Sequence, residues 1–368
     1  MSRIFNSIIS NVNLLILYKN IWSAKKVFAG VFNLITGYPV SFPLTINLLI
    51  TDKCNNFCKM CFYKKSHCVN YDSPGMLTLD EIREFIIHIR DHQPLIHIGG
   101  GEPFMRDDLL DIIYEIKKSG MKCLITTNGS LMNNVAINRL IALKVDVLIV
   151  SLYGPENIHD EITGVRGGYK KTFENLKYVL KKRDKHTRVL VSSIVLPENI
   201  LVFNSFLADL QSLGIDGVKL EQMNFLTRNE YNSGLYTNTQ KSDVNLCPSV
   251  YIIDEEFNQK FVTDLITLHR DIRRNLHRVY MKPYLSQAQM QDWYCGLPQL
   301  RHKCSFITHS VFINYNGDIL PCQFFTNCIV GNIKKDSLAA LWPSERYQGV
   351  RKTITTLLPS ICMRCCKN

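Results

Sequence analysis

The first 51 positions of this 368-residue chain contain no Asp or Glu, and other features are missing elsewhere. No run of five or six basic residues occurs, so the net charge of +11 favours anionic partners in general and gives no sign of nucleic acid. The longest unbroken apolar run near the N-terminus, 14–18, is far too short to span a bilayer. The apolar content of 46% predicts a globular protein with a buried core.

A disulfide framework is also disfavoured. The chain has thirteen cysteines, an odd number, and no cleavable signal peptide is expected ahead of them. Many of these cysteines fall in clusters of the C-x-x-C kind, which in a reducing compartment favour metal or iron–sulfur ligation over disulfides. We therefore expect a cytoplasmic protein that holds metal or clusters through thiolates.

Residues 1–43 predict an amphipathic helical segment. Its apolar side chains recur along one helical face, at Ile4, Ile8, Val12, Leu15, Tyr18 and Trp22. The favoured interpretation is a helix packed against the rest of the protein, because such a helix has the same pattern as an interfacial one. The alternative is contact of residues 1–35 with an anionic membrane surface, which would place the protein peripherally on the inner membrane.

A regular alternation of strands and helices begins at residue 44. Six apolar runs predict buried parallel strands, at 44–50, 95–98, 122–126, 146–151, 188–195 and 217–223. Thr78 and Glu81 have capping-box spacing, and Gly120 suits the end of a helix. The fold class is therefore α/β, and residues 44–226 predict an open, partial (β/α)6 TIM-like barrel.

Several unusual motifs follow the predicted strands. The triple-cysteine loop follows the first strand, "GGGEP" (99–103) the second, "TTNG" (126–129) ends the third, and Ser151 ends the fourth. Because ligands bind at the carboxyl ends of parallel barrel strands, we expect these four features to meet at one mouth.

The loop "CNNFCKMCF" carries three thiols, those of Cys54, Cys58 and Cys61. Three thiolates can hold three corners of a four-iron cubane and leave the fourth iron open to another ligand. A structural zinc site would need a fourth donor, for which His67 or Cys68 is available. Both sites fit the residues, but no second C-x-x-C pair at zinc-finger spacing supports zinc.

C-x-x-x-C-x-x-C followed by Phe62, and then by a GGE segment, resembles the radical S-adenosylmethionine (SAM) superfamily. The resemblance implies that Cys54, Cys58 and Cys61 bind a [4Fe–4S] cluster whose open iron is chelated by SAM. The resemblance also implies which residues bind SAM. Gly100, Gly101 and Glu102 would contact the methionine amine, Ser151 would contact the ribose or carboxylate, and Arg166 would pair with the carboxylate. Asn128 would line the mouth, and the backbone near Phe62 and Tyr63 would contact the adenine. Relatives often carry an acidic residue where this chain has Tyr153, so the ribose contacts are the weakest part of the match.

Residues 227–368 do not continue the regular alternation of strands and helices. Residues 227–303 begin with a polar stretch and are expected to form a linker or lid over the mouth. Residues 304–368 predict a small Cys-rich α+β domain with a β-hairpin and a helix. Asn316 and Gly317 suit a type I′ turn, and closure of that hairpin would bring Cys304 near Cys322.

This C-terminal segment resembles the SPASM or twitch extension of radical SAM enzymes. Cys304, Gly317 and Cys322 match its first motif, and Cys362 with Cys365 would complete four ligands for an auxiliary [4Fe–4S] cluster. Cys328 and Cys366 keep the choice of ligands open. Zinc bound by the same four thiolates is the alternative.

The resemblance implies reductive cleavage of SAM to a 5′-deoxyadenosyl radical, which abstracts hydrogen from a substrate. It also implies an external one-electron donor of the flavodoxin or ferredoxin type. The expected substrate is a peptide or protein, with a lipid, sugar or other small molecule as the alternative. A non-catalytic iron–sulfur electron-transfer protein is the rival class.

Overall fold

The computed structural model describes residues 39–61, 75–232, 251–253, 257, 259–296, 304–357 and 359–365. Most of the predicted N-terminal segment, and Phe62, Tyr63, His67, Cys68 and Cys366, lie outside these ranges. Among the described residues, no helix combines the length and apolar character needed to cross a membrane.

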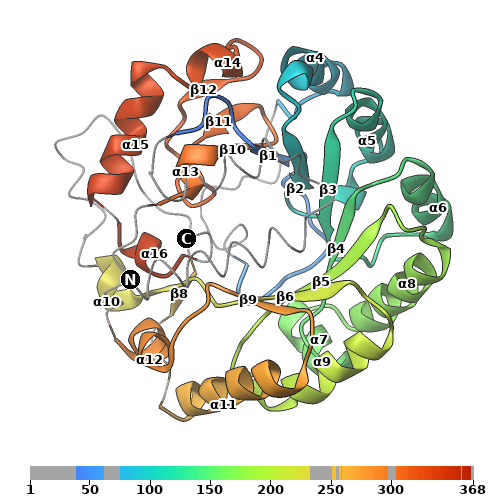
Figure 1. Ribbon diagram of the computed structural model, residues 1–368, viewed down its shortest axis with the longest axis vertical. Helices are drawn as coiled ribbons and strands as arrows, with labels where there is room; N and C mark the ends of the chain where they lie inside the picture. Colours follow the sequence, from blue (N-terminus) through green and yellow to red (C-terminus); the bar gives the residue numbers. More distant parts are fainter. Residues whose placement is uncertain are drawn as a thin grey trace.

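One large sheet organises the molecule (Figure 1). Its ten strands have the order β12-β11-β10-β1-β2-β3-β4-β5-β6-β9. From β10 to β9 all neighbouring strands are parallel, whereas β11 and β12 join as antiparallel strands. The six predicted strands are present as β1 (Thr45–Leu49), β2 (Leu95–Gly99), β3 (Lys122–Thr127), β4 (Val147–Ser151), β5 (Arg188–Ile194) and β6 (Gly217–Glu221).

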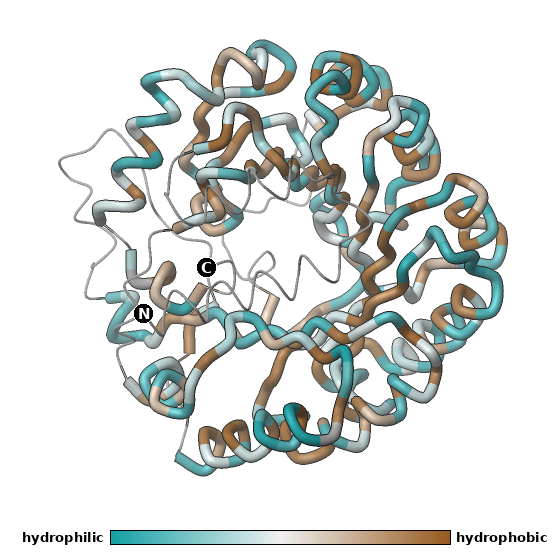
Figure 2. Tube along the Cα trace, viewed as in Figure 1, coloured by the Kyte–Doolittle hydropathy of each residue, from teal (hydrophilic) through white to brown (hydrophobic). Residues whose placement is uncertain are grey.

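Helices cover the outer face of this curved sheet (Figure 1). They are α4 (Leu79–Ile89), α5 (Leu109–Lys118), α6 (Asn134–Ala142), α7 (Glu156–Thr163), α8 (Gly168–Lys182), α9 (Phe203–Ser212) and α11 (Gln259–Asn275). Short 3₁₀ turns η1 (Arg90–His92), η2 (Pro103–Met105) and η3 (Ile200–Val202) lie between them. Figure 2 shows apolar residues along the strands and along the helix sides that face them, as parallel sheets require.

Local signals fix the helix ends as expected. The Thr78 hydroxyl accepts from the Glu81 amide and the Glu81 carboxylate accepts from the Thr78 amide, so the predicted capping box begins α4. Gly120 has a φ of 76° just beyond α5, a conformation that glycine adopts without strain.

The sheet extends beyond the six predicted strands on both edges. On one edge β9 (Val279–Lys282) pairs in parallel with β6, and α12 (Gln287–Cys295) follows it. Residues 279–282, within the segment 227–303, therefore belong to the barrel sheet, and the role of that segment as a linker or lid stays a prediction. The strand β9 was not predicted from the sequence, because its four residues alternate in polarity and form no continuous apolar run.

The C-terminal segment forms the other edge. It comprises α13 (Phe306–His309), β10 (Ser310–Ile313), β11 (Asp318–Leu320), β12 (Gly331–Asn332), α14 (Leu338–Leu341), α15 (Glu345–Leu357) and α16 (Ser360–Met363). The predicted hairpin is present as β10 and β11. The predicted type I′ turn was wrong, because only Gly317 has a positive φ and its amide bonds to the Asn314 carbonyl across a four-residue loop.

Apolar side chains fill the bottom of the barrel. Leu95, Leu124, Val147, Ile149 and Leu190 form a separate buried cluster there. Nearer the carboxyl ends of the strands the lining becomes polar, since the His97 imidazole lies 3.0 Å from the Asn47 side chain and 2.9 Å from the Thr126 hydroxyl. The barrel is thus closed by apolar packing below and has a polar mouth above.

Candidate active site

The triple-cysteine loop follows β1 at the mouth and is fixed on two sides. The Phe57 amide donates to the Thr163 carbonyl (2.7 Å) and the Lys59 amide donates to the Ile162 carbonyl (2.9 Å), which joins the loop to the end of α7. Its three thiols remain partly exposed. The backbone therefore holds the thiols in place while leaving them accessible at the mouth.

The glycines after β2 let two loops pack together. The Gly101 amide donates to the Thr51 carbonyl (2.8 Å), and the Glu102 amide donates to the Lys53 carbonyl (2.7 Å). A Cβ added at Gly101 would overlap the Lys53 carbonyl oxygen, and one at Gly100 would overlap that of Thr51. In the structure these glycines allow a close approach to the start of the cysteine loop, and their contact with SAM stays a prediction.

Glu102 joins the second and third strand ends. Its side chain is 1% exposed, and its carboxylate accepts from the Phe104 amide (3.1 Å), the Thr127 hydroxyl (2.6 Å) and the Asn128 amide (2.6 Å). Burial raises the pKa of the Glu102 carboxyl, while these hydrogen bonds favour the ionised form. The carboxylate therefore orders the mouth, and a contact to the SAM amine stays a prediction.

Asn128 brings the third strand end to the cysteine loop. Its side-chain amide donates to the Asn55 side-chain oxygen at 2.8 Å, and Asn55 in turn donates to the Ser130 hydroxyl at 2.9 Å. The TNG segment is thus connected directly to the loop between Cys54 and Cys58, whereas the GGE segment bonds to Thr51 and Lys53 just before that loop.

Tyr153 lies beside the cysteine loop, at the position where relatives often carry an acidic residue. Its pKa is raised by burial first and then by the negative charges of Cys58, Cys61 and Glu221, while a hydrogen bond with Ser151 lowers it. These neighbours place the phenol at the mouth. Sequence reasoning noted Tyr153 only as a departure and missed Glu221, although a charged residue ending a buried strand was the available signal.

Arg166 is exposed in the turn between α7 and α8. Its pairing with a carboxylate stays a prediction.

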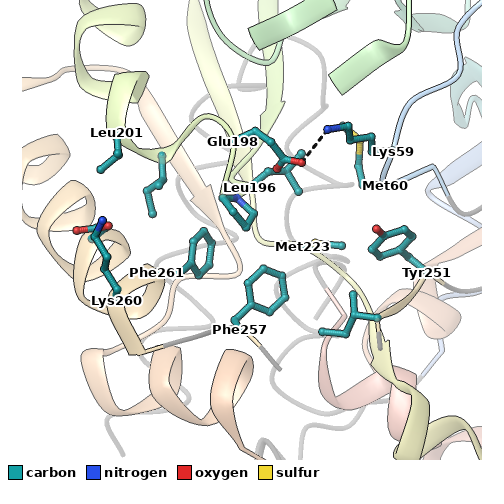
Figure 3. A pocket seen from close by; sticks show the side chains of 14 residues that line it. Lys59, Met60, Leu196, Glu198, Leu201, Met223, Tyr251, Phe257, Lys260 and Phe261 are labelled. Atoms are coloured by element: carbon teal, nitrogen blue, oxygen red, sulfur yellow. Dashed lines mark hydrogen bonds and ion pairs between the residues drawn. The ribbon is translucent and has the colours of Figure 1, made fainter. Parts of the chain in front are cut away.

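A pocket of about 430 Å³ opens beside the cysteine loop (Figure 3). Met60, which lies between two of the cysteines, Leu196 after β5 and Met223 after β6 form one wall. Phe257 and Phe261, whose ring centroids are 4.8 Å apart, face them. At the rim the Lys59 ammonium lies 3.2 Å from the Glu198 carboxylate. The pocket therefore combines an apolar interior with a charged edge.

The C-terminal cysteines form a second, buried group. Cys304, Cys322, Cys328 and Cys365 are buried, and Cys362 packs against the same core. Burial first, and then the charges of Cys304 and Cys322, raise the pKa of the Cys362 thiol. Cys304, Cys322 and Cys362 are thus near one another, in agreement with the proximity of Cys304 and Cys322 that the hairpin predicted.

Both groups fit iron–sulfur clusters by their donor chemistry. The ten described cysteines form no disulfide among themselves. Thiolates are the usual ligands of iron–sulfur clusters, and four of them can also hold a zinc ion, so the donor set fits a cluster at each group without excluding zinc at the second.

The fold, the open triple-cysteine loop and the buried second group define an iron–sulfur enzyme that uses SAM. Residues 48–201 match the model of the radical SAM superfamily, and residues 304–366 match that of the SPASM iron–sulfur cluster-binding domain. The chain belongs to the radical SAM superfamily, with a SPASM domain as its C-terminal part. It is therefore a radical SAM enzyme, whose cofactors are SAM, the [4Fe–4S] cluster of the radical SAM domain and an auxiliary iron–sulfur cluster.

Known relatives cover most of the chain. A tungsten-containing aldehyde ferredoxin oxidoreductase cofactor-modifying protein of Pyrococcus furiosus is 25% identical over 346 residues, 86% of each chain. An AdoMet-dependent heme synthase of Nitratidesulfovibrio vulgaris is 28% identical over 311 residues, 82% of this chain and 79% of the relative. The crystal structure of Streptococcus suis SuiB bound to precursor peptide SuiA has a TM-score of 0.56 at 18% identity and covers 93% of this chain and 75% of SuiB. This last similarity is one of fold.

Proposed function

We propose that this enzyme is a peptide maturase, which abstracts a hydrogen atom from a residue of a peptide. The observation that carries the proposal is the pocket beside the cysteine loop (Figure 3). Its volume of about 430 Å³ lies within the range of ligand pockets. An apolar interior with a charged rim suits an apolar side chain on a polar backbone. The fold shared with SuiB, which binds a precursor peptide, supports the same proposal.

Cys54, Cys58 and Cys61 would hold the cluster, and Cys304, Cys322, Cys362 and Cys365 the auxiliary one. Bound cluster and SAM supply the 5′-deoxyadenosyl radical by one-electron reductive cleavage. The external donor is expected to be flavodoxin- or ferredoxin-like.

The chain itself contributes order at the mouth. The buried Glu102 carboxylate fixes the Thr127 and Asn128 segment, and the glycines before it hold that segment against the cysteine loop. Apolar walls at Met60, Leu196 and Met223 limit the access of water to the reacting centre. Substrate carbon atoms would therefore meet the radical in an ordered and largely dry space.

A small-molecule substrate is the second candidate. The relatives from P. furiosus and N. vulgaris, which cover most of this chain, are named for cofactor modification and heme synthesis. The polar mouth, where Lys219 and Glu221 form an ion pair of 2.7 Å, could hold a charged ligand.

The test compares substrates under one set of conditions. Reconstituted enzyme, dithionite and SAM are incubated anaerobically with a library of short peptides deuterated at apolar residues, or with porphyrins. The peptide proposal predicts deuterium in 5′-deoxyadenosine and a modified peptide, measured by mass spectrometry. Deuterium transfer from porphyrins alone, with peptides no better than buffer, would favour the second candidate.

Pocket variants sharpen this test. Phe261→Leu shortens a pocket wall and should raise KM for an accepted peptide several-fold while SAM cleavage without substrate continues. Phe206→Leu is the matched control, since Phe206 is equally buried (3% against 5% exposed) on α9 and does not line the pocket. Equal KM values for the two variants would exclude the pocket as the peptide site.

A further inference from the structure

A buried tyrosine on α15 has a hydroxyl without a partner. Tyr347 is fully buried, and its ring is held on two sides. The Trp342 ring lies with its centroid 5.0 Å away, and the Arg351 guanidinium lies 4.2 Å from the Tyr347 centroid and 3.9 Å from that of Trp342. The ring therefore has little freedom to turn its hydroxyl elsewhere.

The Tyr347 hydroxyl makes no hydrogen bond to any described residue. Arg351, only 5% exposed, donates through Nε to the Ile307 carbonyl (3.0 Å) and through Nη1 to the Trp342 carbonyl (2.9 Å), but its Nη2 is also unpartnered. An unsatisfied buried donor costs about 1–3 kcal/mol, and phenylalanine would fill the same space without that cost. Two buried donors on packed neighbouring side chains, neither with an acceptor among the described residues, indicate that a further acceptor belongs in this part of the core.

The groups around the phenol are the C-terminal cysteines. Burial first raises the pKa of Tyr347, the Arg351 cation lowers it, and the negative charges of Cys328, Cys322 and Cys304 raise it further. Tyr347, Cys304, Cys322 and Cys328 belong to one buried core, and Cys362 packs against it, so the phenol lies in the same core as the group proposed to hold the auxiliary cluster. Thiolate and sulfide sulfur atoms are hydrogen-bond acceptors for such a donor.

We propose that the Tyr347 hydroxyl donates a hydrogen bond to a sulfur atom of the auxiliary cluster, with Arg351 as the adjacent buried cation. Because reduction adds negative charge, a donor and a cation stabilise the reduced state more than the oxidised one. Tyr347 therefore raises the reduction potential of this cluster. The inference rests on the assignment of the C-terminal cysteines as ligands.

The test uses a full-length parent, named the loop variant, in which Cys54, Cys58 and Cys61 are all alanine, so that only the auxiliary cluster remains. Tyr347→Phe is added, and the cluster is titrated anaerobically by electron paramagnetic resonance. Loss of one hydrogen bond should change the ratio of reduced to oxidised cluster about tenfold at a fixed potential. For a one-electron couple this lowers the midpoint by about 59 mV. Tyr178→Phe on α8, where the hydroxyl is exposed and contacts Asn138, should leave the midpoint unchanged.

Three outcomes of this experiment would contradict the inference. An unchanged midpoint in Tyr347→Phe, with full iron, would show that the hydroxyl does not bond to the cluster. Loss of iron in Tyr347→Phe alone would also contradict it, because removing one donor should not unload four thiolate ligands. Absence of iron from the loop variant itself would overturn the ligand assignment. Hyperfine coupling from an exchangeable proton, present in the loop variant and absent from Tyr347→Phe, would support the inference independently.

Discussion

The strongest single perturbation outside the cysteines is predicted at Arg364, which lies between Cys362 and Cys365. Arg364 is 1% exposed and donates to both oxygens of the buried Glu230 carboxylate (2.6 Å each). It also donates to the carbonyls of Trp293 and Gly296 (2.6 Å each). This one side chain therefore joins the C-terminal tail to α10 (Arg228–Asn232) and to the end of α12.

Arg364→Met should lower the free energy of unfolding by about 3–5 kcal/mol, since it leaves the Glu230 carboxylate buried without its cation. Arg364→Lys should cost about 2 kcal/mol, because one ammonium that pairs with Glu230 cannot also make the Nε and Nη2 hydrogen bonds to the Trp293 and Gly296 carbonyls. Combining Arg364→Met with Glu230→Met should cost less than the sum of the single changes, because no buried charge is left unpaired.

Urea unfolding of the anaerobic holoprotein, followed by circular dichroism together with iron content, measures these effects. Arg139→Met is the control, because Arg139 and Asp111 form an exposed ion pair of 2.7 Å that should contribute about 0–1 kcal/mol. If Arg364→Met costs under about 1 kcal/mol, or if the double variant is additive, the pair does not hold the tail in place.

Three further predictions follow from the same contacts. Gly101→Ala should abolish SAM binding measured by calorimetry and cost about 1–3 kcal/mol in urea unfolding, because its methyl group would overlap the cysteine loop; wild-type affinity would contradict this. Burial lowers the pKa of His159 to about 4, so the unfolded chain binds a proton at this histidine near pH 6.5 whereas the folded chain does not. The free energy of unfolding should therefore fall as the pH drops from 6.5 towards 4, and His159→Phe should make that fall shallower by up to about 1.4 kcal/mol per pH unit. An acid unfolding profile identical to that of the wild type would contradict this prediction. The loop variant should contain roughly four irons per chain against about eight in the wild type, and adding Cys365→Ala should remove the rest while Cys366→Ala should not; zinc in place of that iron would revive the zinc interpretation.

The sequence was informative where a run of residues is mostly apolar. All six central strands were predicted from such runs, although polar side chains interrupt them at Asn47, His97 and Lys219. The strand β9 has no such run, since Tyr280 and Lys282 alternate with Val279 and Met281. Its pairing with β6 depends on a partner distant in the chain and so left no local signal.

The same distinction between local and long-range signals applies to the active site. The cysteine loop and the GGE segment are local motifs, and their placement at neighbouring strand ends followed from the barrel. Contacts between distant segments could not be predicted: Glu230 meets Arg364 across 134 positions, and nothing near Tyr347 in the sequence indicates that its hydroxyl is buried without a hydrogen bond to any described residue. Such long-range polar contacts follow from the packing and need the structure.

The N-terminal segment remains a prediction, because residues 1–38 lie outside the described ranges. The favoured interpretation is packing against the barrel, and the alternative is contact with an anionic membrane surface.

The most direct test of the account is SAM cleavage by the triple-cysteine loop. Reconstituted wild type and Cys58→Ala are incubated anaerobically with dithionite and SAM, and 5′-deoxyadenosine is measured by liquid chromatography with mass spectrometry. Because three thiolates are the fewest that hold a cubane with one open iron, the wild type should form 5′-deoxyadenosine and Cys58→Ala should form none above background, with unchanged circular dichroism. Equal yields from the two proteins would contradict the assignment of this loop as the radical-generating centre.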